Sequence, residues 1–273
     1  MTRARPRSLF APNVWNQALA ALRRRDEEVF IGLDLDGTLA PIARRPESAR
    51  VAPGTLRLLD QSARAFRVTL IVLSARPRSV LRSLIPVPRV HMIGQYGLEG
   101  LPAPAAPRRT RARKAYPDLV LELRNLAAAC PGALIEPKGL TVAVHDRGVA
   151  PARIPPLRRA IRRSEIRARH RGFQTIGGHR VTDFVPIGHD KGTALRAALA
   201  RFRPDTAFYF GDSPADEPAF RELGAAGFSV RVGPGPTRAL YRVGDLRGVT
   251  KFLKTVVRLR GSEPKVLEVS ACT

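Results

Sequence analysis

The chain has 273 residues and a formal net charge of +24, because 47 lysine and arginine residues outnumber 23 aspartate and glutamate residues. A hydrophobic content of 44% is enough for a folded core, which excludes wholesale disorder. No apolar stretch approaches the roughly 20 residues that span a bilayer, and two cysteines are too few for a disulfide framework. We therefore expect a soluble protein of the cytoplasm without a membrane partner, and a monomer is the simplest assembly.

The positive charge is almost entirely arginine, which is densest in Arg108–Arg113 and Arg158–Arg171. Such an excess could attract a polyanion such as a nucleic acid. However, no zinc-finger, RNP-type or GXXG motif accompanies it, and aromatic residues make up only 6% of the chain. We interpret the arginines as a solvated surface rather than as a nucleic-acid interface.

The first part of the chain alternates strands and helices. Asn13–Arg25 has a composition similar to that of a transit peptide, but a leading helix packed on the domain is the simpler interpretation. Apolar runs predict strands at Val29–Leu35, Val68–Leu73 and Val90–Ile93, and a helix is expected at Pro53–Ala65. This order predicts right-handed crossovers and a parallel sheet.

The pattern changes after Leu101–Arg113, which is rich in proline, alanine and arginine and predicts a linker. A helix from Tyr116 is followed by a strand at Leu140–His145, a helix at Pro156–Arg171, and strands around Phe173–Ile176 and Arg180–Val185. Two helices on a small antiparallel sheet would form a compact α+β insert.

The α/β pattern then returns, with a last helix at Leu246–Leu259 and a loose tail at Gly261–Thr273. The intervening elements are expected at Lys191–Arg201, Ala207–Gly211, Glu217–Leu223 and Gly227–Val232. We therefore predict an α/β protein with a Rossmann-like parallel-sheet core, formed by residues 1–104 and 185–273, and an inserted α+β cap of residues 105–184.

Asp34 and Asp36 follow the first predicted strand, at the edge of a parallel sheet where ligands bind. Residues i and i+2 of a strand point the same way, so both carboxylates can face one crevice. Two carboxylates so close repel each other unless a cation or a shared proton intervenes, and Mg²⁺ prefers oxygen ligands. The pair indicates a magnesium site in which one aspartate attacks phosphorus and the other transfers a proton. An ordinary Asp-Gly turn is the alternative.

Other predicted strands and helices bring polar residues to the same edge. Ser74 ends the second strand, where its hydroxyl could hold a phosphate or cap a helix. Lys191 opens a helix, an unfavourable place for a lysine unless it reaches an anion. Asp212 and Asp216 follow a later strand; a helix N-terminus explains Asp216 but not Asp212. In so basic a chain, these carboxylates indicate a metal.

These segments, in this order, resemble the motifs of the haloacid-dehalogenase superfamily of phosphotransferases, and the resemblance covers nearly the whole chain. It implies that Asp34 forms an aspartyl-phosphate, and that Asp36 protonates the leaving oxygen and then activates water. The implied ligands of Mg²⁺ are Asp34, the main-chain carbonyl of Asp36, Asp212 and Asp216. Ser74 and Lys191 would neutralise the phosphoryl oxygens.

Residues 135–147 resemble the cap motif of the trehalose-6-phosphate phosphatase family, whose usual form is Glu-Asp-Lys followed by His-Tyr-Arg. Glu136, Lys138, His145 and Arg147 match that pattern. The resemblance implies that Glu136, Lys138 and His145 bind the sugar, and that the planar guanidinium of Arg147 closes over the phosphate. A half-exposed strand with scattered charges is the alternative.

Other positions depart from the family pattern. Residues 178–186 resemble Gly-Lys-x-Val-x-Glu-x-Arg-Pro, but Asp183 stands at the sugar-binding glutamate and Val185 replaces the arginine. Gln95 and Tyr96 replace the acid and histidine of a common Glu-His-Gly, and Ala215 replaces a threonine. Asp183 is still assigned to the substrate-binding residues, with a side chain one methylene shorter.

The resulting hypothesis is a Mg²⁺-dependent phosphatase of trehalose biosynthesis, which hydrolyses trehalose 6-phosphate, a small-molecule partner, through an aspartyl-phosphate. A related phosphatase acting on sucrose phosphate or glucosylglycerol phosphate is the first alternative. A sugar-phosphate sensor without turnover, and a non-catalytic nucleic-acid-binding protein on the same scaffold, are further alternatives.

Overall fold

A parallel sheet of seven strands forms the centre of the protein. The computed structural model describes residues 6–43, 45–101 and 107–261. The strand order is β1-β11-β10-β9-β2-β3-β4, and every pairing is parallel. In that order the strands are Arg7–Ser8, Tyr241–Val243, Phe228–Val232, Thr206–Gly211, Val29–Leu33, Val68–Leu73 and His91–Ile93. The predicted α/β core is therefore confirmed.

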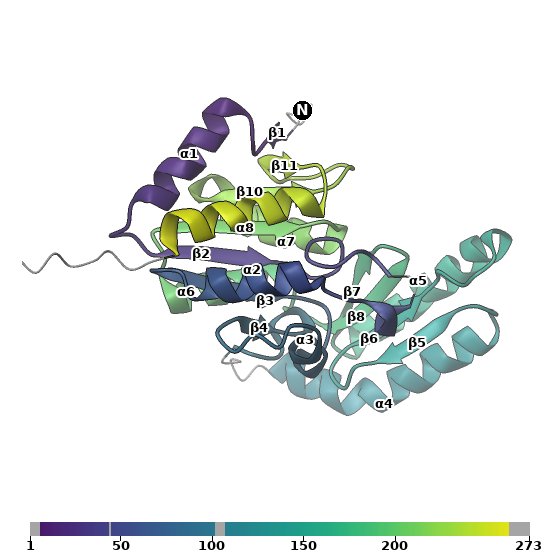
Figure 1. Ribbon diagram of the computed structural model, residues 1–273. Coiled ribbons are helices and arrows are strands. Elements are labelled where there is room, and N and C mark those ends of the chain that lie inside the picture. The colour runs from purple at the N-terminus through teal and green to yellow at the C-terminus, as the bar shows by residue number, and fades with distance from the viewer. Residues whose placement is uncertain (1–5, 44, 102–106, 262–273) are drawn as a thin grey trace, which may run out of the picture.

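Helices cover both faces of this sheet (Figure 1). One face packs against α1 (Pro12–Arg23), α2 (Pro53–Ala63), α3 (Arg78–Leu84) and α8 (Leu246–Arg260), and the other against α6 (Lys191–Phe202) and α7 (Glu217–Leu223). Alternate residues of a strand point to opposite faces, so Ile31 joins the first cluster and Phe30 the second. The central strand β2 is buried throughout, as expected for a parallel sheet covered on both sides.

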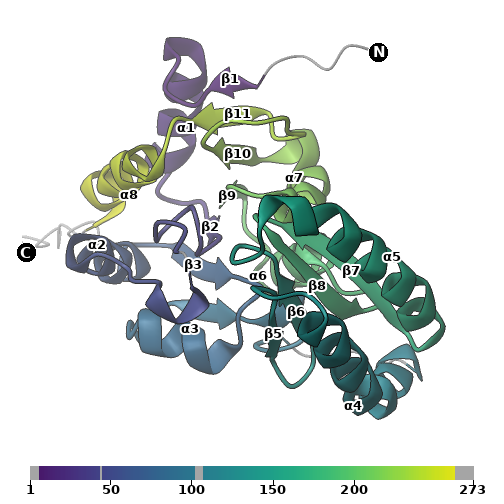
Figure 2. The same ribbon diagram turned by 90° about the vertical axis from the view of Figure 1, so that its right-hand side faces the viewer.

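A second sheet, inserted in the chain between β4 and α6, lies beside one edge of the core (Figure 2). Its four antiparallel strands have the order β5-β6-β8-β7. They are Leu134–Pro137, Val142–His145, Val181–Pro186 and Phe173–Gly178. The helices α4 (Pro107–Ala128) and α5 (Ile154–His170) pack on this sheet around a separate apolar cluster. We call this unit the cap, and the expected α+β insert is confirmed.

Several details of the sequence prediction were wrong. The strand β5 was not predicted, because its four residues end in a proline and show no apolar run. The two-residue β1 and three-residue β11 were too short to detect. The predicted linker is wrong in its second half, since α4 begins at Pro107, where proline fits a first helical turn. The rest of that linker, residues 102–106, and the tail after Gly261, including Cys272, lie outside the described residues.

The leading helix is part of the fold, because α1 packs on α8 and its apolar side joins the core. Arg260, the last residue of α8, is fully buried. Its guanidinium donates to main-chain oxygens at the end of α1 and beyond it, at 2.9 Å to Leu22, 2.5 Å to Arg24 and 2.8 Å to Glu27. Every helix in the described part of the chain is too short or too polar to span a bilayer.

Candidate functional site

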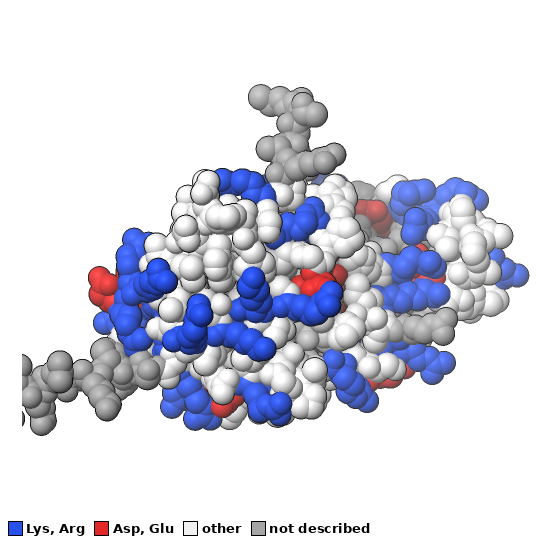
Figure 3. Space-filling view, turned by 45° about the horizontal axis from the view of Figure 1, so that its top comes forward, with Lys and Arg blue, Asp and Glu red and all other residues white. Residues whose placement is uncertain are grey.

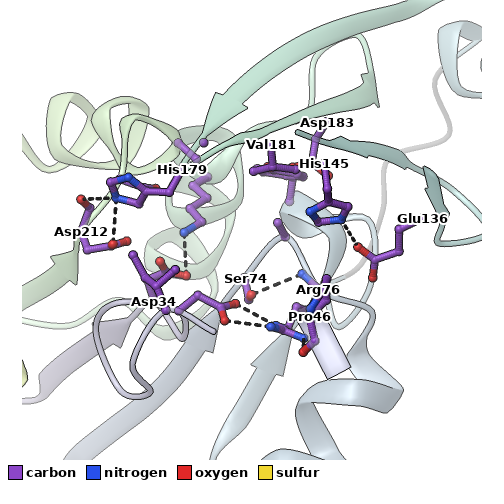
Figure 4. Close-up of a pocket in the computed structure, with 18 of the residues that line it drawn as sticks. Asp34, Pro46, Ser74, Arg76, Glu136, His145, His179, Val181, Asp183 and Asp212 are labelled. Atoms are coloured by element: carbon purple, nitrogen blue, oxygen red, sulfur yellow. Dashed lines mark hydrogen bonds and ion pairs between the residues drawn. The ribbon is translucent and has the colours of Figure 1, made fainter. Parts of the chain in front are cut away.

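A pocket lies between the carboxyl ends of the core strands and the cap (Figure 4). The structure brings nearly all of the predicted site residues to its wall. These are Asp34, Asp36, Ser74, Glu136, Lys138, His145, Arg147, Asp183, Lys191 and Asp212. Asp216 does not line the pocket; it is fully buried in the core and bonded to Lys191.

Three buried aspartates form a cluster on the core side of the pocket. Asp34 follows β2, and Asp212 and Asp216 follow β9. One carboxylate oxygen of each lies within 4.8 Å of the others. The Nζ atom of Lys191, at the start of α6, lies 2.7 Å from both Asp34 Oδ1 and Asp216 Oδ1. The hydroxyl of Tyr209 also donates to Asp216, at 2.8 Å.

The turn after β2 makes room for this cluster. Gly37 has a φ of +82°, and a Cβ atom there would lie 2.0 Å from Asp212 Oδ2. Only glycine fits a backbone that is both left-handed and so close to a carboxylate. Similarly, a Cβ on Gly211 would lie 2.2 Å from Asp216 Cγ. Both glycines therefore allow the main chain to approach the acidic side chains.

The charges in the cluster are not balanced by protein groups alone. Burial, together with Asp216 and Asp212, raises the pKa of Asp34 well above its usual value, although Lys191 opposes this. Burial and Asp216 raise the pKa of Asp212 to about 6. Lys191 keeps a raised pKa against burial because Asp216 and Asp34 favour its charged form. Two of the carboxylates therefore lack a positive partner strong enough to keep them readily ionised.

A cation fits this arrangement. The Oδ1 atom of Asp212 is buried and has no hydrogen-bond partner in the described structure. An oxygen donor left unpaired beside two further carboxylates is suited to a hard divalent ion. Asp34, Asp212 and Asp216 thus form a candidate metal centre, as the sequence predicted. The carboxylate of Asp36 is not part of this triad.

Asp36 is instead held by an arginine that we did not assign. Arg76 Nε and Nη2 donate to its two oxygens at 2.7 and 2.8 Å, and Arg76 Nη1 donates to the carbonyl of Pro46 at 2.8 Å. Burial opposes the charge of Arg76, but Asp36 raises its pKa overall. Ser74, which is buried, accepts from the main-chain nitrogen of Arg76 at 3.2 Å. The position of Arg76 two residues after Ser74 was the signal that could have identified it.

The cap provides the opposite wall of the pocket. His145 Nε2 lies 2.8 Å from Glu136 Oε2 on neighbouring strands, and Lys138 Nζ lies 2.8 Å from Asp183 Oδ1. Burial opposes ionisation of Glu136, but His145 and Lys138 lower its pKa overall. Lys138 has a raised pKa, because Asp183 and Glu136 outweigh its burial. The cap therefore presents an ion pair, Lys138–Asp183, and a hydrogen-bonded pair, Glu136–His145, to the pocket.

Two other cap residues contact the core. Arg147 lines the pocket, but its guanidinium donates to the carbonyl of His179, at 2.9 and 3.2 Å, and to the carbonyl of Ala43. His179 Nε2 in turn lies 3.0 Å from Asp212 Oδ2. His179 stands at the lysine of the Gly-Lys-x-Val motif but was not assigned to the site, because its contact with Asp212 depends on how the hairpin between β7 and β8 reaches the core.

Comparisons with known proteins agree with this geometry. The sequence profile of a family described as Trehalose-phosphatase matches residues 32–241. A bifunctional trehalose-6-phosphate synthase/phosphatase of Thermoproteus tenax is 29% identical over 81% of this chain and 31% of the relative. A trehalose-phosphate phosphatase of Mycobacterium bovis is 31% identical over 86% of this chain and 62% of the relative. The chain thus spans between about a third and three-fifths of these relatives.

Solved structures show the same architecture. A crystal structure titled as a trehalose-6-phosphate phosphatase related protein has a TM-score of 0.70 and 26% identity, covering 84% of this chain and 97% of the other. A haloacid dehalogenase-like hydrolase from Bacteroides thetaiotaomicron has a TM-score of 0.56 at 14% identity, covering 84% of this chain and all of the other. The fold is that of the haloacid-dehalogenase-like hydrolases.

Proposed function

Because this chain belongs to the trehalose-phosphatase family, we propose that it is a Mg²⁺-dependent phosphatase that hydrolyses trehalose 6-phosphate to trehalose and phosphate. The observation that carries this proposal is the buried Asp34–Asp212–Asp216 triad, which opens onto a pocket whose other wall is the cap. The core and the insert would act as the catalytic and substrate-binding domains, with boundaries near residues 104 and 184.

Asp34 is the proposed nucleophile. One of its carboxylate oxygens forms a bond to phosphorus while the bond between phosphorus and the sugar oxygen breaks, which leaves an aspartyl-phosphate. Lys191 is bonded to Asp34 Oδ1 and lies where it can also neutralise a phosphoryl oxygen. Ser74, at the end of the next strand, would donate its hydroxyl to the same group.

Mg²⁺ bound by Asp34, Asp212, Asp216 and the main-chain carbonyl of Asp36 would neutralise the phosphoryl charge and keep Asp34 ionised.

Asp36 is the proposed proton carrier. In its protonated form it gives a proton to the departing sugar oxygen, and the resulting carboxylate takes one from the water that hydrolyses the aspartyl-phosphate, so its protonated form is restored. The two bonds from Arg76 fix the orientation of this carboxylate, and its side chain is 34% exposed, so water can reach it. Arg76 is therefore a positioning residue in this mechanism.

The cap residues Glu136, Lys138 and His145 are proposed to bind the sugar. Arg147 would act less directly than the resemblance implies, because its donors are directed to the carbonyls of Ala43 and His179. In this position it ties the cap to the core loop beside the pocket. We propose that it closes the pocket and that Lys191 and Ser74 contact the phosphate.

The test is phosphate release from a panel of trehalose 6-phosphate, sucrose 6-phosphate and glucosylglycerol phosphate, with Mg²⁺ and with EDTA. We expect Mg²⁺-dependent turnover that favours trehalose 6-phosphate, and loss of turnover in the Asp34→Asn variant with an unchanged circular-dichroism spectrum. Preference for another sugar phosphate would transfer the assignment to the related phosphatases, which the altered Asp183 and Val185 make the leading alternative. Turnover by Asp34→Asn would refute the nucleophile.

A further inference from the structure

Four positions that depart from the family pattern lie together at the junction of core and cap. Tyr96 lies in the short helix η2 (Gln95–Gly97) after β4, and Ala215 lies in the turn after β9. Asp183 and Val185 both belong to the cap strand β8. The side chains of Tyr96, Val185 and Ala215 form one buried apolar cluster. The tyrosine ring thus occupies a socket made by a valine of the cap and an alanine of the core.

The hydroxyl of Tyr96 points out of this apolar cluster towards Asp183. It donates to Asp183 Oδ2 at 2.9 Å, while Asp183 Oδ1 lies 2.8 Å from Lys138 Nζ. Tyr96 and Asp183 are each 2% exposed. Burial and the neighbouring Asp183 raise the pKa of Tyr96 well above its usual value, so it remains a donor. Both oxygens of the buried carboxylate are therefore occupied by protein donors, as burial of a charge requires.

The contacts continue from Lys138 to the wall of the pocket. Lys138 Nζ lies 3.8 Å from Glu136 Oε2, and its side chain is 5% exposed. Glu136, which is bonded to His145, has a side chain that is 30% exposed. Figure 4 shows Glu136 and His145 facing each other on the cap side of the pocket. Of the polar groups in this chain of contacts, Glu136 is the one most available to a ligand.

We propose that Tyr96 is a positioning residue for the sugar subsite, which fixes Asp183 and through it Lys138, so that Glu136 and His145 are presented to the sugar hydroxyls. Asp183 is then a structural link between core and cap rather than a direct sugar ligand. The four departures from the family pattern form one unit. The ring of Tyr96 needs its apolar neighbour Val185 and its small neighbour Ala215, and the shorter side chain of Asp183 needs the tyrosine hydroxyl as a donor. This inference rests on the proposed function.

The Tyr96→Phe variant tests the link, since it removes the hydroxyl and leaves the ring in its socket. We expect KM for trehalose 6-phosphate to rise about five- to tenfold, in line with the loss of one buried hydrogen bond, while kcat stays within about twofold. Hydrolysis of p-nitrophenyl phosphate, which has no sugar, should keep its kcat/KM. The Asp183→Asn variant and the double variant complete the cycle. The rise in KM in the double variant should be smaller than the product of the rises in the two single variants.

Tyr241→Phe is the control, because Tyr241 is also a buried tyrosine but lies in β11, which the strand order separates from β4, the strand before Tyr96. It should leave both substrates unaffected. Equal changes for both substrates in Tyr96→Phe, no change in either, or fully multiplicative effects with Asp183→Asn would each overturn the inference. Failure of the proposed function would appear separately, because the wild-type enzyme would then prefer another sugar phosphate. The comparison of wild type with Tyr96→Phe is then made on that sugar phosphate and on p-nitrophenyl phosphate.

Discussion

At the scale of single residues, the site combines three aspartates whose charge calls for a cation with a fourth, Asp36, whose charge is balanced by Arg76. Asp34 and Asp216 share Lys191 as a direct partner, and Asp212 contacts His179. Asp36 instead accepts two hydrogen bonds from Arg76. A planar guanidinium can hold both oxygens of a carboxylate at once, which a lysine cannot do. Asp34 and Asp36 are therefore adapted to different tasks, although they are only two residues apart in the sequence.

The raised pKa of Asp212, about 6, makes stability depend on pH and on the metal. An unfolded aspartate titrates near pH 4, so between about pH 4 and 6 the folded metal-free protein binds the extra proton and loses stability as the pH rises. A cation replaces that proton at higher pH. We expect Mg²⁺ to raise Tm by several degrees at about pH 7.5 and to have little effect at about pH 4.5.

Differential scanning fluorimetry with Mg²⁺ or EDTA at both pH values measures this effect. The Asp212→Asn variant supplies the control, because it should lose most of the Mg²⁺-dependent shift at the higher pH. An equal shift at both pH values would contradict the link between the proton and the metal.

At the scale of secondary structure, the site depends on the turns that follow the parallel strands. Gly37→Ala places a methyl group against the carboxylate of Asp212 in a left-handed backbone. We expect a loss of about 2 kcal/mol or more in the free energy of unfolding, and a weaker Mg²⁺-dependent shift in Tm. Gly188→Ala separates the cost of the left-handed backbone from that of the close contact, because Gly188 has a φ of +92° but open space around it.

Chemical denaturation of both variants checks this prediction. Gly188→Ala should lose only the cost of the backbone, about 1 kcal/mol, and keep its response to Mg²⁺. If both variants lost stability equally and kept that response, close packing against Asp212 would not be the reason for the glycine.

The central strands β2, β3 and β9 were predictable because each is a dense apolar run, and a polar residue follows each of them directly. Asp34, Ser74 and Asp212 were found in this way, since topology places successive strand ends at one edge. Arg76 could have been identified from its position two residues after Ser74, but the contacts of Tyr96 with Asp183 and of His179 with Asp212 were not predictable. Each depends on the distance between segments that are remote in the sequence, and a single sequence contains no signal for that distance.

At the scale of the whole molecule, the positive net charge suits the attraction of a small anion rather than of a nucleic acid. Basic side chains are spread over the face shown in Figure 3, with few acidic ones between them. A phosphorylated sugar is an anion, so a broadly positive surface should accelerate its arrival. We expect kcat/KM to fall several-fold between about 20 and 200 mM salt, while kcat remains nearly constant.

Steady-state kinetics at both salt concentrations, with viscosity held constant, measure this dependence. Potassium chloride and potassium acetate should give the same result, which excludes a specific effect of chloride. A kcat/KM that is independent of salt would show that the arginines do not attract the substrate.

The contacts of Arg260 also constrain the order in which the protein can form. The helix α1 is synthesised well before α8, but the guanidinium that binds its last carbonyls belongs to Arg260 of α8, and β1 pairs with β11. Until α8 has left the ribosome, the apolar side of α1, with Val14, Ala18 and Leu22, has no α8 on which to pack. Helix α1 thus docks only after the much later α8 has been made, and nascent chains that stop before α8 should be the ones that chaperones retain.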